Sequence, residues 1–185
     1  MARLFSIKPG ITLKGRKFKG LRGYAGKPFH PPLTDIPVAC YFLFPIFDLI
    51  SLVSEDGSEL SKNLFNAGTY VLVAGLIVTV PTALTGFWDW LKSTTKHTQA
   101  WRTANWHMAI MLTVTALVVV NLIERQDQLF ASPVLTIVSL LIAALVSLGA
   151  TYGGSLVYDY GFNVETAGDH PVWHESEEDV MPGEK

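Results

Sequence analysis

The sequence has little of what soluble and catalytic domains depend on. Cys40 is the one cysteine among 185 residues, so neither a disulfide framework nor a cysteine-ligated metal site is expected. Only 16% of the residues are charged, against roughly 25% in soluble domains. The sequence has no phosphate-binding loop, nucleophile triad or metalloprotease signature. These absences argue against a soluble enzyme, and we predict no catalytic residues.

Apolar residues make up 49% of the chain and gather in four blocks. Each block approaches the ~20 residues that cross a ~30 Å hydrocarbon core. We therefore predict an all-α fold, an integral membrane four-helix bundle, with spans at about 35–53, 65–90, 104–123 and 134–158. Asp48 lies near the end of the first span, where we expect it at the membrane interface rather than in the interior. No secretory signal is expected, because the first 30 residues have no apolar stretch of the required length.

The two ends of the chain carry opposite charge. Residues 1–34 form a basic arm with eight Lys or Arg and no acid, and residues 161–185 form an acidic tail, so that residues 35–160 make up the membrane domain. The arm could lie on anionic lipid headgroups or bind an acidic partner. Nucleic acid is not expected, because the net charge is −2 and no recognition motif follows.

The distribution of basic residues predicts how the bundle is oriented. Four spans place both termini and the central loop on one side, and that side carries 12 of the 14 Lys and Arg residues. Because loops rich in Lys and Arg remain in the cytoplasm, we predict that both termini are cytoplasmic.

Several chemically useful side chains converge on this cytoplasmic side. His30 precedes the first span and His107 opens the third, and two facing imidazoles can ligate haem b inside a four-helix bundle. The pair could instead relay protons or serve quinone chemistry, or it could only bond neighbouring polar groups. Against haem, only His107 is expected within a span. The other polar residues expected at this end are Asp89, Arg102, Asn105, Tyr158 and Tyr160.

Other patterns give weaker signals. His170 and His174 could share one helical face, but Pro171 and the missing third ligand argue against a metal site. Gly149 and Gly153 have the four-residue spacing of close helix packing, which we expect inside the bundle. Four tryptophans around the central loop are expected to anchor in the membrane interface: Trp88, Trp90, Trp101 and Trp106.

Four short motifs, in order along the chain, resemble one known family. They are His30-Pro31-Pro32-Leu33, Gly86-Phe-Trp-Asp89-Trp90, Arg102-Thr-Ala104-Asn-Trp-His107, and Gly153-Gly154 followed by Tyr158-Asp-Tyr160-Gly161. Over about residues 26–164 the chain is similar to the small bacterial four-helix membrane proteins called domain of unknown function 2231. The resemblance implies a multi-pass protein of the bacterial cytoplasmic membrane. Some relatives carry this domain joined to a Rieske iron–sulfur domain, which implies a setting in membrane electron transfer.

Together these features predict a non-catalytic subunit of a larger membrane assembly, a redox or energy-converting one, with other membrane-protein subunits as partners. The short loops leave no room for a soluble active site. The alternative is a b-type haem protein that transfers electrons with His107 and His30 as ligands. A transporter is disfavoured, because Asp48 and Asn121 are the only candidates that the spans offer for a polar group in the membrane, and no internal repeat is evident in the sequence.

Overall fold

The computed structural model describes residues 20–21, 28–55 and 57–162. Most of the basic arm and the tail from residue 163, which includes His170 and His174, lie outside the described residues. The described chain folds into four helices, α1 (His30–Val53), α2 (Glu59–Ser93), α3 (Gln99–Arg125) and α4 (Pro133–Tyr158). Each helix is long and apolar enough to cross a membrane. The predicted all-α membrane bundle is therefore confirmed.

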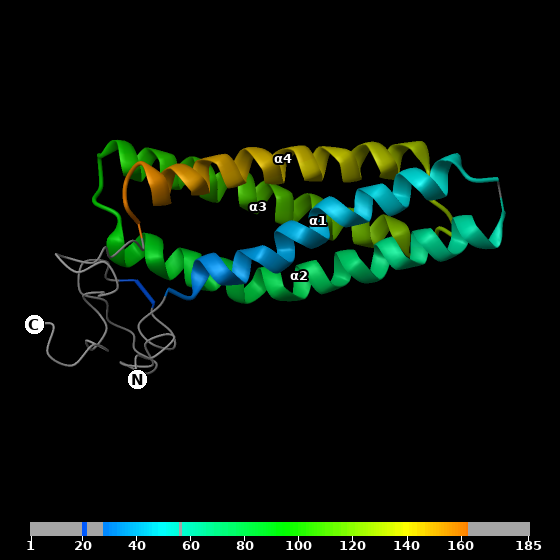
Figure 1. Cartoon of the computed structure of the whole chain (residues 1–185), viewed down its shortest axis with the longest axis horizontal. Coiled ribbons are helices and arrows are strands. Elements are labelled where there is room, and N and C mark those ends of the chain that lie inside the picture. The colour runs from blue at the N-terminus through cyan, green and yellow to red at the C-terminus, as the bar shows by residue number, and fades with distance from the viewer. Residues whose placement is uncertain (1–19, 22–27, 56, 163–185) are drawn as a thin grey trace, which may run out of the picture.

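The helices run alternately up and down along one long axis (Figure 1). α1 packs against α2 and α4, and α3 packs against α4 and α2, with the α2–α3 contact the smallest among the described residues. α1 and α3 therefore lie diagonally opposite each other. The α2–α3 loop lies at the same end as the start of α1, and the other two loops lie at the opposite end (Figure 1).

Three of the four helices begin at a side-chain cap. The hydroxyls of Ser58, Thr98 and Ser132 each accept a hydrogen bond from the backbone N–H three residues further on. Such caps satisfy one of the otherwise unpaired N–H groups of a first turn. α1 begins without a side-chain cap and has Pro31 and Pro32 in its first turn. Proline is tolerated there because the N–H groups of a first turn have no hydrogen-bond acceptor within the helix. The starts of α2, α3 and α4 are thus encoded locally.

The core is a stack of apolar side chains along the bundle axis. Its fully buried members are Tyr41, Phe44, Leu72, Val114, Val118, Ile142 and Val146. The outward faces are apolar as well, as shown by Ile77 and Ile137, which are 66% and 65% exposed. A helix that is apolar all round suits a bundle whose outer surface meets lipid.

A buried ion pair closes the opposite end of the bundle. Nη1 and Nη2 of Arg125 donate to Oδ2 and Oδ1 of Asp48, both at 2.8 Å, and neither side chain is more than 1% exposed. Ser139 donates to the same carboxylate at 2.8 Å, and Arg125 also donates to the carbonyl of Phe65 and the hydroxyl of Thr69.

The expectation that Asp48 lies at the interface is therefore wrong. The predicted third span ended at residue 123, which left Arg125 in a loop, whereas α3 continues to Arg125 and turns it inward. A carboxylate can be buried when an opposite charge and further hydrogen bonds compensate for its lost water.

Candidate functional site: the histidine pair

His30 and His107 face each other inside the bundle, at the end that contains the α2–α3 loop. We call this the histidine end. The two ring centroids are 6.4 Å apart and the ring planes are at 79°. His30 is the first residue of α1, so it belongs to a membrane helix and does not precede it as expected. His107 lies two turns into α3. The two rings thus come from diagonal helices.

Each ring is anchored through the same atom. Nδ1 of His30 lies 2.9 Å from the carbonyl oxygen of Thr82 in α2, and Nδ1 of His107 lies 2.8 Å from the carbonyl oxygen of Gly149 in α4. Because a carbonyl only accepts, Nδ1 carries the hydrogen in both rings. A neutral imidazole protonated at Nδ1 has its free lone pair on Nε2. No group in the described part of the chain hydrogen-bonds Nε2 of either ring.

A glycine makes each of these carbonyls accessible. Gly86 follows Thr82 by four residues, and Gly153 follows Gly149 by four. Side chains in a helix lean toward the N-terminus, so a side chain at position i+4 would cover the carbonyl of residue i. A Cβ at Gly86 would come within 2.6 Å of Cε1 of His30, and a Cβ at Gly153 within 3.1 Å of Cε1 of His107. Both rings therefore pack where a side chain is missing.

Asp89 ties the segment before α1 to α2. Its carboxylate is buried and accepts a hydrogen bond of 2.8 Å from the backbone N–H of Leu21. The carbonyl of Leu21 in turn accepts from the backbone N–H of Phe29, at 3.2 Å. Asp89 lies one turn beyond the glycine that supports His30, so it fixes the start of α1 close to that ring.

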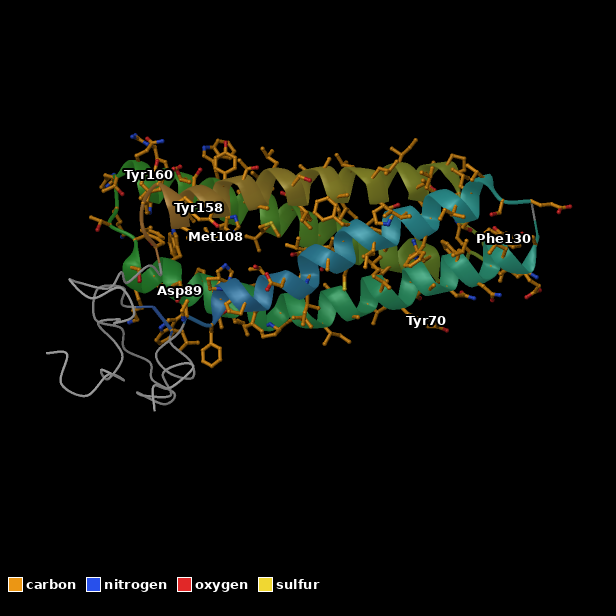
Figure 2. All side chains as sticks on the ribbon, viewed as in Figure 1. Tyr70, Asp89, Met108, Phe130, Tyr158 and Tyr160 are labelled. Atoms are coloured by element: carbon orange, nitrogen blue, oxygen red, sulfur yellow. The ribbon has the colours of Figure 1, made fainter. Side chains whose placement is uncertain are left out.

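The other polar residues predicted for this end divide into two groups. Asn105 of α3 accepts a hydrogen bond of 2.9 Å from Nε1 of Trp90 of α2, so it joins two helices. Arg102 is exposed, and within the described part of the chain it donates to Gln99 of its own helix. The side chains of Tyr158 and Tyr160 lie at the histidine end, as Figure 2 shows, but are 88% and 36% exposed. The two histidine rings thus meet inside the bundle, while Asp89 and Asn105 join separate elements at the same end.

Residue spacing alone did not identify the parts that hold the rings. The sequence suggested close helix packing for Gly149 and Gly153 and placed Gly86 in a family motif, but it did not relate Gly86 and Gly153 to the carbonyls four residues earlier. One signal was available in the sequence: α2 and α4 each have a glycine at about the same level along the bundle as one of the two histidines. The backbone carbonyls of Thr82 and Gly149 carry no side-chain signature, so only the structure could identify them.

The donor set limits what the site can hold. The described residues contain no cluster of three or more His, Cys, Asp or Glu side chains able to bind a metal ion. Two imidazoles alone give half of the four ligands that a bound zinc ion takes. They are, however, the complete pair of axial ligands for an iron that already carries four porphyrin nitrogens.

Comparison with known proteins supports the membrane assignment. No curated protein and no solved structure matches the sequence. The profile of one family, described as a predicted membrane protein (DUF2231), matches residues 26–166 and so covers all four helices and the histidine pair. The chain therefore belongs to the DUF2231 family of predicted membrane proteins.

Proposed function

We propose that this protein binds one haem b between His30 and His107 and passes single electrons, as a non-catalytic subunit of a bacterial membrane electron-transfer assembly. The observation that carries the proposal is the geometry of the two rings. Each ring donates its Nδ1–H to a backbone carbonyl, no described residue hydrogen-bonds Nε2, and both rings belong to helices long enough to cross a membrane.

The spacing of the rings fits a shared iron. An imidazole nitrogen binds a metal at about 2.0 Å and lies about 1.1 Å from its own ring centre, so two axial imidazoles have centroids about 6 Å apart. The observed separation is 6.4 Å. Metal-binding histidines commonly donate their other N–H to a carbonyl, which fixes the ring and makes the ligand more basic. Both rings already make this hydrogen bond.

The ligand pair favours electron transfer over catalysis. A haem held by both histidines would have no position left open for oxygen or substrate, so the chemistry it would supply here is the transfer of one electron at a time. The donor and the acceptor would be one-electron carriers such as iron–sulfur or haem proteins. The loops at 54–58, 94–98 and 126–132 are too short to contain such a carrier.

The structure also supports the proposed orientation. Arg125 is buried in an ion pair, so it does not count among the basic residues that set topology. Lys62 is then the only Lys or Arg left for the opposite face, against the basic arm, Lys92, Lys96, Arg102 and Lys185 on the other. We propose that the histidine end faces the cytoplasm, where the basic arm can also contact anionic lipid.

An absorption spectrum of the purified protein tests the haem proposal directly. Wild type should show a Soret band, whether isolated with haem or reconstituted with haemin. His30→Ala and His107→Ala should each lose the band while keeping a helical circular dichroism spectrum. His97→Asn is the matched control, because His97 is exposed in a loop at φ 67°, a backbone conformation that asparagine tolerates. Folded wild-type protein that stays colourless in haemin would refute the proposal.

Electron paramagnetic resonance gives a second reading of the same site. The hydrogen bonds to Nδ1 hold the ring planes at 79°. Ferric haem with nearly perpendicular axial planes should give a strongly anisotropic low-spin signal. The rhombic signal of parallel planes would contradict the geometry of the pair, even if haem is bound.

A further inference from the structure

α1 and α3 carry a second inward-facing pair besides the histidines. Asp48 follows His30 by 18 residues, and Arg125 follows His107 by the same number. Eighteen residues are five turns, so His30 and Asp48 lie on one face of α1, about 27 Å apart along the axis. His107 and Arg125 are related in the same way in α3. The two diagonal helices thus meet through paired side chains at both ends of the bundle.

The equal spacing belongs to a repeat of the whole helical hairpin. A shift of 77 residues carries four buried positions of α1 onto four buried positions of α3, namely Pro37, Tyr41, Phe44 and Asp48 onto Val114, Val118, Asn121 and Arg125. A shift of 67 residues does the same from α2 to α4, namely Gly68, Leu72, Gly75 and Thr79 onto Leu135, Ser139, Ile142 and Val146. The residue types differ, which is why no repeat is evident in the sequence.

The anchors of the two histidines obey the same relation. The carbonyl of Thr82 and the glycine at position 86 serve His30, and the positions 67 residues later, Gly149 and Gly153, serve His107. The hairpins α1–α2 and α3–α4 are therefore equivalent halves about an approximate twofold axis along the bundle. Both the histidine pair and the Asp48–Arg125 pair lie across this axis.

The second pair lies on the same helix faces as the histidines and across the same axis, but its two side chains bind each other. The carboxylate of Asp48 takes both bonds of the Arg125 guanidinium and one from Ser139. Nε of Arg125 donates to Thr69, so all three guanidinium nitrogens have acceptors. The two charges thus compensate each other, and three hydrogen bonds occupy most of the acceptor sites of the Asp48 carboxylate, which makes it a poor ligand for a metal.

We infer that the fold provides two positions on one axis, each formed by one side chain from α1 and one from α3. In this chain only the histidine position can hold a haem, so electrons enter and leave at the histidine end. The inference is an extension of the proposed haem function. It assigns both redox partners to the surface around the α2–α3 loop and excludes transfer across the membrane through this subunit.

Reduction of wild-type protein in liposomes tests the inference. Dithionite added outside supplies a radical anion that gives one electron to ferric haem and does not cross the bilayer. Trypsin cleavage after the exposed Lys96 measures which fraction of molecules has the histidine end outside. The fraction of the haem that is reduced before detergent is added should equal the fraction of molecules with the histidine end outside. Reduction of the whole haem pool before detergent would overturn the inference, whereas a protein without a Soret band would refute the haem proposal itself.

A designed second site tests the equivalence of the two positions. The double variant Asp48→His/Arg125→His should bind two haems per chain. External dithionite should then reduce haem in every molecule, whichever end of the bundle faces outward. A variant that keeps the native haem but gains no second one would overturn the equivalence. If the variant fails to fold, the reduction experiment on wild type still decides whether transfer is confined to one face.

Discussion

Replacing Gly86 by alanine should displace His30 and weaken binding at the proposed haem site. The added Cβ would lie 2.6 Å from Cε1 of the ring, whereas ordinary contacts begin at 3.4 Å. The ring must therefore retreat by about 0.8 Å, enough to stretch its 2.9 Å hydrogen bond to Thr82 past the ~3.2 Å limit of a good bond. Overpacking of this kind costs about 1–3 kcal/mol.

Two further glycines make this prediction a graded series. At Gly153 the new Cβ would lie 3.1 Å from His107, so a smaller shift suffices. At Gly154 the nearest atom is 3.9 Å away, and alanine should stabilise the helix by about 0.5–1 kcal/mol. Gly86→Ala should lose haem affinity by roughly 5- to 150-fold, which corresponds to about 1–3 kcal/mol.

The assay compares haem content per protein, by the pyridine haemochrome method, with thermal unfolding in detergent. Haem retention should fall in the order wild type and Gly154→Ala, then Gly153→Ala, then Gly86→Ala. Among the haem-free proteins, Gly154→Ala should unfold at the highest temperature, followed by wild type, Gly153→Ala and Gly86→Ala, because the collision with the ring exists without haem. If Gly86→Ala retains haem and melts higher than wild type, the packing of the ring on this glycine is not what holds it.

Two further predictions concern the opposite end of the bundle, and unfolding in mixed micelles measures both. Arg125→Met should destabilise by about 3–5 kcal/mol because it leaves the Asp48 carboxylate buried without its partner. The double variant Asp48→Asn/Arg125→Met should lose less than the sum of the single variants, and strict additivity would mean that the pair is not coupled. Ser51→Ala should cost about 1–3 kcal/mol because the N–H of Ala131 loses its acceptor. Its control Ser147→Ala is exposed and should stay within about 0.5 kcal/mol; equal losses in both would count against the role of Ser51.

Local patterns predicted the four helices because a bilayer demands long apolar segments of nearly fixed length. The ends of the helices were less predictable. α1 begins at His30 instead of near residue 35, and α3 ends at Arg125 instead of near residue 123. At both places polar residues lie inside a helix because a partner on another helix satisfies them. Such a partner cannot be read from hydropathy.

The sequence by itself determined that the protein is an all-α membrane bundle with His30 and His107 at one end, because hydrophobic length and alternation of direction suffice for that. Only the tertiary structure decided that the two rings meet and that Asp48 is buried against Arg125. It also decided that each ring donates to a backbone carbonyl that is accessible because the residue four positions later is a glycine. The physical reason is that these contacts join residues 42–77 positions apart, and their acceptors include backbone carbonyls, which every residue has. Sequence spacing can place such groups at one depth of the membrane, but only packing selects their partners.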